Sequence, residues 1–157
     1  KAVRATGADF ILKVNADCPL FDPVLGTRAI KLASAAPSCD FVTNKLELTY
    51  PLGLSVELVS GRSLVWCDNN LRNPIDRELT INYLLERPEQ FPQNVFKQNQ
   101  NFGHLDLTLD TPDDYVLIRK IFEDLYPQNH TFGWSELKNW INKCEDLPTC
   151  AYLGVGD

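Results

Sequence analysis

Short apolar segments alternate with amphipathic segments along most of the 157-residue chain. The apolar segments are typical of buried β-strands, whereas the amphipathic ones repeat their apolar residues with the period of a helix. Strands that alternate with helices indicate an α/β fold with a largely parallel or mixed sheet. We therefore expect one domain over residues 1–157, with strands near residues 10–14, 40–43, 56–59, 94–98 and 105–109.

Capping residues and prolines predict where the helices begin. A short polar side chain can accept hydrogen bonds from the first backbone N–H groups of a helix, and proline fits the first helical position. Such signals occur at Asp22-Pro23, Ser60, Asn73-Pro74 and Thr111-Pro112. The expected helices run from Pro23 to about Ala36, from Ser60 to Leu71, from Pro74 to the residue before Pro88, from Pro112 to about Tyr126, and from Trp134 to Lys143.

The composition excludes several classes of function. The formal net charge is -6, whereas binding to nucleic acid needs clustered Lys and Arg. No apolar run approaches the roughly 18 residues that a membrane span requires. The five cysteines form no Cys-x-x-Cys pair, and neither histidine lies at a metal-ligand spacing from them. Both observations argue against a structural zinc site. We expect reduced thiols and a cytoplasmic protein, although Cys144 and Cys150 are close enough in sequence to pair under oxidation.

Two aspartates follow predicted strands at matching positions. Asp17 comes after FILKV (10–14) and Asp110 comes directly after LDLTL (105–109), and a proline follows each of them. Ligands of open α/β sheets bind outside the carboxyl ends of the strands. If the two strands are neighbours, their carboxylates can hold Mg²⁺ together with substrate phosphates, as at a nucleotidyl-transfer centre. The plainer alternative is that Asp17 belongs to a turn and Asp110 supports the next helix.

For the other reactive side chains, the sequence gives weaker support for a functional role. His104 precedes a predicted strand, so contact with substrate and an ordinary strand-end position are both open. Cys18 lies beside Asp17 but has no histidine near it in sequence that would activate a thiolate. We expect Arg77 to make exposed ion pairs and the three tryptophans to belong to the core.

Five segments between about residues 7 and 143 carry a family resemblance. They are GADFILKVNADCPLFDP, DFVTN, TYPLGLSVELVS, RELTINYLLERPEQF and HLDLTLDTPDDYVLIRKIFEDLY. Together and in this order they resemble the cytidylyltransferases of the spore-coat-polysaccharide type, which are related to the CMP-sialate and CMP-Kdo synthetases. The resemblance implies a three-layer, Rossmann-like nucleotide-diphosphosugar-transferase fold. It also implies Mg²⁺-dependent transfer from CTP to a sugar or sugar acid, giving a CMP-sugar for surface polysaccharide biosynthesis.

The same resemblance assigns the site residues. Asp17 and Asp110 are implied to bind the metal. The segment TYPLGLSVE is implied to bring Tyr50, Gly53 and Glu57 near the sugar acceptor, and His104 is a further candidate for substrate binding. Gly53 also has a local explanation, because a glycine after Pro-Leu permits a turn with positive φ.

The chain departs from the family pattern at three internal places and at its start. It has Ser55 where the family usually has Asp, Asp106 in place of Arg, and Glu78-Leu79-Thr80 in place of Glu-His-Val-Thr. The family's first strand and its loop rich in Arg, Ser, Gly and Lys have no counterpart here. We therefore expect an N-terminally truncated version of the fold.

These departures leave functions of different classes open. In the first, the chain is the C-terminal portion of a CTP-dependent sugar cytidylyltransferase that acts once the missing segment completes it. In the second, it is a truncated, diverged module that binds or assembles without catalysis, and it forms a homodimer that covers an exposed sheet edge. A transferase that uses another nucleotide is a third possibility, since the segments that choose the base lie outside this chain.

Overall fold

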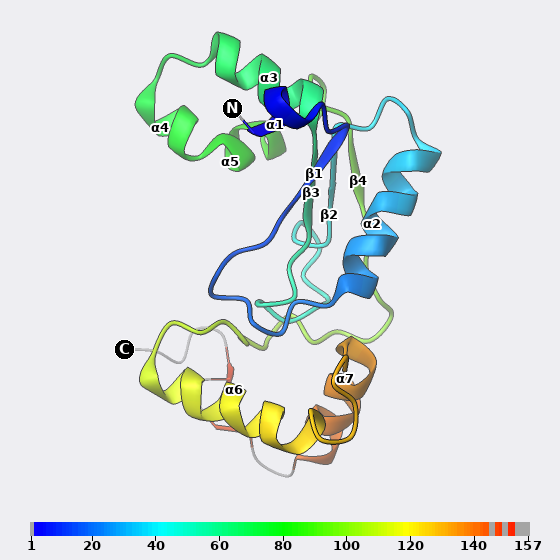
Figure 1. The fold of residues 1–157 in the computed structure, drawn as a ribbon, viewed down its shortest axis with the longest axis vertical. Helices are drawn as coiled ribbons and strands as arrows, with labels where there is room; N and C mark the ends of the chain where they lie inside the picture. Colours follow the sequence, from blue (N-terminus) through cyan, green and yellow to red (C-terminus); the bar gives the residue numbers. More distant parts are fainter. Residues whose placement is uncertain (1, 145–146, 149–150, 153–157) are drawn as a thin grey trace. The chain divides into compact units, whose positions relative to one another are not determined.

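The computed structural model describes residues 2–144, 147–148 and 151–152 (Figure 1). The strands are β1 (Phe10–Lys13), β2 (Phe41–Thr43), β3 (Glu57–Ser60) and β4 (Gln93–Val95). The helices are α1 (Ala2–Thr6), α2 (Pro23–Ala35), α3 (Gly61–Asn70), α4 (Pro74–Glu78), α5 (Thr80–Leu85), α6 (Pro112–Leu125) and α7 (Trp134–Lys143). None of the described helices is both long enough and apolar enough to cross a membrane.

The chain divides into two compact units. Unit 1 consists of Lys1–Lys13, Leu25–Glu47 and Val56–Phe96, and unit 2 consists of Val14–Val24, Leu48–Ser55 and Lys97–Asp157. Each unit therefore draws on three separate segments of the chain. The prediction of a single domain stays a prediction.

Unit 1 is built on a four-stranded mixed sheet in the order β1-β3-β2-β4. Strand β3 pairs antiparallel with β1 and with β2, while β2 pairs in parallel with β4. Every residue of β2 and β3 is buried, and Phe41 and Val59 from these strands pack with Cys67, Leu84 and Phe91. The predicted α/β class with a mixed sheet is confirmed.

Local signals fix the helix starts of unit 1. Ser60 caps α3 by accepting a hydrogen bond from Ser63 N–H, and Asn73 caps α4 by accepting one from Ile75 N–H. The single helix predicted from Pro74 to Pro88 is wrong, because Leu79 breaks it into α4 and α5. At this break the Thr80 hydroxyl donates back to the Arg77 carbonyl at 2.8 Å, an interaction that competes with regular helix geometry.

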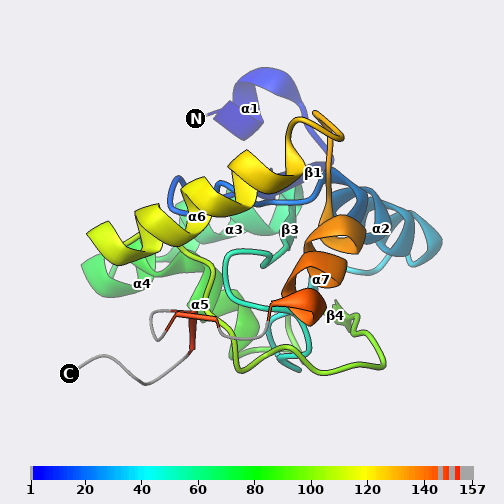
Figure 2. The same ribbon diagram turned by 90° about the horizontal axis from the view of Figure 1, so that it is seen from below.

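Unit 2 contains α6, α7 and several extended loops. The two helices contact each other (Figure 2) and bury Leu117, Ile121, Leu137 and Ile141. Of the three tryptophans, Trp134 is buried, whereas Trp66 and Trp140 are only partly buried.

The segment 105–109, which the sequence predicts to be a strand, is not one of the regular strands. Its backbone N–H groups donate to four different places. Leu105 N–H donates to the Phe102 carbonyl, Asp106 N–H to that of Ala151, Leu107 N–H to that of Leu52, and Leu109 N–H to that of Asp17. Because the bonds are shared among several segments, only isolated bridges form instead of a continuous ladder.

Candidate functional site

The segments that carry Asp17 and Asp110 lie next to each other in unit 2. Leu109 N–H donates a hydrogen bond to the Asp17 carbonyl oxygen at 2.8 Å, and Asp110 follows directly. The backbone segments of the two predicted metal ligands are thus adjacent, but not as the ends of neighbouring strands. Asp17 follows β1, which pairs with β3, while residues 105–109 are outside that sheet.

The start of α6 does not use the Asp110 carboxylate. Thr111 caps the helix by accepting from Asp114 N–H at 3.3 Å, and the Asp114 carboxylate accepts from Thr111 N–H at 2.7 Å. The exposed Asp110 side chain instead accepts a hydrogen bond at Oδ2 from the Thr108 hydroxyl at 3.0 Å. Helix capping therefore gives no reason for an aspartate at position 110.

The turn around Asp17 is closed by a backbone hydrogen bond. Cys18 N–H donates to the Asn15 carbonyl at 3.2 Å. The half-buried Asp17 side chain accepts from the Cys18 thiol, with Oδ1 and Sγ 3.2 Å apart. A thiol that donates to a carboxylate agrees with the expectation that Cys18 is not an activated nucleophile.

Thr108 is a residue of this site that the sequence analysis missed. Its hydroxyl lies 2.6 Å from Asp106 Oδ1 and 3.0 Å from Asp110 Oδ2, so it can donate its one proton to either carboxylate. Thr108 N–H also donates to Asp106 Oδ1 at 3.0 Å. The signal was present in the alternation Asp106-x-Thr108-x-Asp110, because alternate residues of an extended segment share one side.

The donor set at these two aspartates suits a hard cation that keeps other ligands. Within the described part of the chain, no group of three or more His, Cys, Asp and Glu side chains could hold a metal ion. Two carboxylates suffice for Mg²⁺, which usually takes its remaining ligands from phosphates and water. Asp106 adds a further negative charge beside Thr108.

Two of the predicted substrate residues have structural roles in unit 2. Gly53 adopts φ +87°, and a Cβ atom there would lie 2.5 Å from the Leu107 carbonyl oxygen, so only glycine fits this turn. The positive-φ turn predicted at Gly53 is confirmed. Tyr50 is 4% exposed, and its ring packs edge-on against Trp134 with centroids 5.9 Å apart.

His104, also in unit 2, is an exposed residue. Its ring stacks on Phe102 and on Tyr152, with centroid distances of 6.5 and 6.2 Å. Its position at the surface is compatible with substrate contact and with an ordinary stacked histidine.

Glu57 belongs to unit 1 and is buried at the start of β3. Its Oε2 pairs with Lys13 Nζ at 2.8 Å, and its Oε1 pairs with Lys45 Nζ at 3.1 Å. A buried carboxylate is costly unless it is paired, and here both oxygens have a cationic partner. The predicted substrate residues are therefore divided between the two units.

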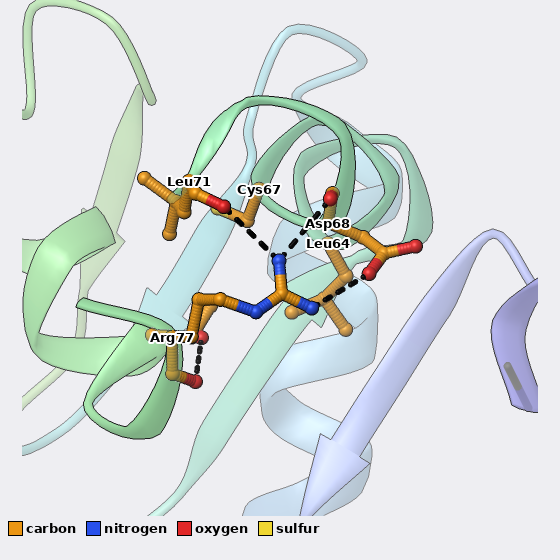
Figure 3. A pocket seen from close by; sticks show the side chains of 6 residues that line it. Leu64, Cys67, Asp68, Leu71 and Arg77 are labelled. Carbon is orange, nitrogen blue, oxygen red and sulfur yellow. Dashed lines mark hydrogen bonds and ion pairs between the residues drawn. The ribbon is translucent and has the colours of Figure 1, made fainter. Parts of the chain in front are cut away.

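A separate pocket of about 150 Å³ lies between α3 and the α4–α5 segment of unit 1 (Figure 3). Arg77 lines this pocket and donates to the carbonyls of Asp68 and Leu71 and to Asp68 Oδ1, at 3.1 to 3.2 Å. The prediction of an exposed ion pair for Arg77 is confirmed. The polar groups of this pocket bond to one another, so the pocket does not add to the candidate site.

Comparison with known proteins identifies the fold. No protein-family model and no curated protein matches the chain. The solved structure of a cytidylyltransferase from Leptospira borgpetersenii serovar Hardjo-bovis (strain JB197) is similar, with a TM-score of 0.82 and 24% sequence identity. The similarity covers 90% of this chain and 59% of that chain. This chain therefore has the fold of a solved cytidylyltransferase and spans less than two thirds of its length.

Proposed function

We propose that the chain is part of a Mg²⁺-dependent cytidylyltransferase that transfers CMP from CTP to a sugar or sugar acid. The product would be a CMP-sugar for surface polysaccharide biosynthesis. The adjacency of the Asp17 and Asp110 segments through the Leu109–Asp17 hydrogen bond is the observation that carries this proposal. The likeness of the fold to a solved cytidylyltransferase supports it.

In this proposal Asp17 and Asp110 hold Mg²⁺. When bound, the ion supplies positive charge that offsets the charge on the phosphate oxygens. The side chains next to the two aspartates orient the carboxylates: the Cys18 thiol donates to Asp17 Oδ1, and the Thr108 hydroxyl, when it does not donate to Asp106, donates to Asp110 Oδ2. Asp106 makes the local charge more negative, which strengthens the attraction of the site for a divalent cation.

Metal binding by the whole 157-residue chain tests the proposal without an activity assay. Mn²⁺, as a spectroscopic substitute for Mg²⁺, is titrated into the wild type, Asp17→Asn and Asp110→Asn and followed by electron paramagnetic resonance. Each substitution should weaken binding by about tenfold or more, because it removes one of two carboxylate ligands. Asp113→Asn, an exposed acidic residue in the first turn of α6, is the matched control and should bind like the wild type. Equal affinity for all four proteins would contradict the metal assignment.

A specific observation favours the second candidate, a binding or assembly module without catalysis. Tyr50 is packed against Trp134 and Glu57 is paired with two lysines, so two residues predicted to lie near the acceptor already have internal partners. Incubation with CTP, Mg²⁺ and a sialic or Kdo-type sugar acid distinguishes the candidates. A CMP-sugar that the wild type forms and Asp110→Asn does not form excludes the non-catalytic module. Metal binding with no product supports it for the chain as it stands.

A further inference from the structure

A cavity of about 260 Å³ lies at the amino ends of β2 and β4 in unit 1. Asp40 directly precedes β2, and Phe91 lies just before β4. The side chains that line the cavity are those of Asp40, Arg62, Ser63, Trp66, Gln90 and Phe91. The volume is several times the roughly 30 Å³ that one water molecule takes up in the liquid. The cavity can therefore hold a small organic molecule.

The hydrogen bonds of the Asp40 carboxylate are unevenly shared between its two oxygens. The hydroxyls of Ser60 and Ser63 and the Nε–H of Arg62 all donate to Oδ1, and no donor of the described residues reaches Oδ2. Within the same part of the chain, every buried side-chain oxygen or nitrogen has a hydrogen-bond partner. Oδ2 is consequently open to solvent, although Asp40 as a whole is only 7% exposed. It is an acceptor that a ligand in the cavity can use.

Arg62 likewise keeps a donor group in reserve. Its Nε–H bonds to Asp40, and its Nη2 group donates to the Ser38 carbonyl at 2.8 Å. Its Nη1 group donates to none of the described residues, and the side chain is 58% exposed. Because Asp40 and Arg62 carry opposite charges, the pair attracts neither a simple cation nor a simple anion. A ligand with one charge of each sign fits it better.

The remaining wall of the cavity is aromatic. The half-buried ring of Trp66 lies edge-on to Phe91, with centroids 5.3 Å apart, and stacks on Tyr83 at 6.3 Å. Phe91 is 3% exposed and belongs to the core cluster of unit 1. These rings are thus held in place, and an apolar group of a ligand would lose water-exposed surface against them.

We propose that this cavity binds a free α-amino acid with an apolar side chain. The α-ammonium group donates to Asp40 Oδ2, the α-carboxylate accepts from Arg62 Nη1, and the side chain packs on Trp66 and Phe91. The site is separate from the one proposed for CTP and Mg²⁺. Ligands of open α/β sheets bind outside the carboxyl ends of the strands, whereas this cavity lies at the amino ends of β2 and β4.

The protonation state of Asp40 suits this role. Burial raises the pKa of its carboxyl, but the hydrogen bonds from Arg62, Ser60 and Ser63 and the charge of Arg62 outweigh burial and lower it. The group is therefore ionised at neutral pH. An ionised carboxylate only accepts hydrogen bonds, and it accepts them most strongly from a charged donor such as an ammonium group.

L-Phenylalanine is the probe, titrated into the whole 157-residue chain. The nuclear magnetic resonance signal of the Trp66 indole N–H should shift in a saturable way, with a dissociation constant on the order of 1 mM or lower. The indole signals of Trp134 and Trp140, both in unit 2, should stay in place. A Trp66 signal that does not move, or three signals that move alike, would overturn the proposal.

Two analogues test the recognition of each end of the amino acid on the unaltered chain. 3-Phenylpropionate has no ammonium group, and phenethylamine has no carboxylate. Each should bind at least about tenfold more weakly than L-phenylalanine, because one charge of the Asp40–Arg62 pair is left facing the ligand without a partner. Equal affinity for the three compounds would mean that the ion pair does not recognise the ligand and would contradict the proposal.

A matched pair of substitutions locates the site. Arg62 and Arg119 each donate from Nε to a carboxylate at 2.7 Å, and their side chains are 58% and 63% exposed. Arg62→Gln should raise the dissociation constant of L-phenylalanine about tenfold, whereas Arg119→Gln, on α6 of unit 2, should leave it unchanged. Circular dichroism checks that both variants fold. Equal dissociation constants for the two variants would place the binding site elsewhere.

Discussion

Asp22 connects two helix starts in unit 2. Its Oδ1 accepts from Val24 N–H at 2.7 Å, as expected for the cap of α2, and its Oδ2 accepts from Trp134 N–H, the first residue of α7, at 2.9 Å. The side chain is only 5% exposed. The sequence predicts the first bond from its neighbours, whereas the second joins residues far apart in the chain.

Asp22→Ala should therefore lower the free energy of unfolding by about 2–4 kcal/mol, because it removes two charge-assisted caps at a buried position. Asp113→Ala, which removes an exposed carboxylate from the first turn of α6, should cost less than about 1 kcal/mol. Urea denaturation measures both values. Similar losses for the two variants would mean that the Trp134 bond contributes nothing.

Substitution of the two glycines with positive φ distinguishes the energetic cost of backbone strain from the cost of a steric clash. Gly53 (φ +87°) has the Leu107 carbonyl oxygen 2.5 Å from the position of a Cβ atom, whereas Gly7 (φ +64°) has no atom within 4 Å of it. Gly7→Ala should cost about 1–2 kcal/mol for backbone strain alone. Gly53→Ala should cost about 2–4 kcal/mol, since the Leu107 backbone must also move. Thermal unfolding of both variants is the measurement, and a Gly7→Ala loss as large as that of Gly53→Ala would refute the steric argument.

At the scale of elements, a polar cluster joins β3 to α3. Asp40 Oδ1 accepts from the Ser60 hydroxyl at 2.5 Å, from the Ser63 hydroxyl at 2.6 Å and from Arg62 Nε at 2.7 Å. Burial by itself raises the pKa of the Asp40 carboxyl, but the hydrogen bonds from Arg62, Ser60 and Ser63 and the charge of Arg62 outweigh it. The pKa of Asp40 therefore lies below its ordinary value.

This lowered pKa predicts how the stability of unit 1 depends on pH. A carboxyl whose pKa is lower in the folded state stabilises the protein above its unfolded pKa, which is about 3.9 for Asp, and loses this contribution as the pH falls through the folded value. Asp40→Asn should lower the free energy of unfolding by about 1–3 kcal/mol at pH 7. The difference from the wild type should shrink when urea denaturation is repeated below about pH 4. If the difference in the free energy of unfolding between the wild type and Asp40→Asn did not change with pH, the ionised Asp40 carboxylate would not be what stabilises the protein.

At the scale of the whole molecule, the acidic composition governs solubility. The formal net charge is -6 at pH 7 and the sequence pI is about 4.9. Since proteins near zero net charge associate and precipitate most readily, turbidity at low salt should peak near pH 5 and disappear toward pH 7. Turbidity that rises steadily from pH 5 to pH 7 would contradict this account. The same net charge fits the expectation that nucleic acid is not the main partner.

The sequence by itself determined the mixed α/β class and the starts of α3, α4 and α6. These features are local, because a cap such as Ser60 or Thr111 reaches a backbone N–H only three residues away. The polar alternation around Thr108 was equally readable, although it was missed. The length of α4 was not readable in this way, since the pattern of apolar residues continued past the break at Leu79.

Only the tertiary structure decided which distant segments meet. It shared the backbone bonds of residues 105–109 among several segments, so the predicted strand did not form, yet one of those bonds joined Leu109, the residue before Asp110, to Asp17. It also gave Glu57 two lysine partners and Asp22 a second helix to cap. The physical reason is the same in each case: a buried polar group must find a partner, and no local pattern states which remote segment will supply it.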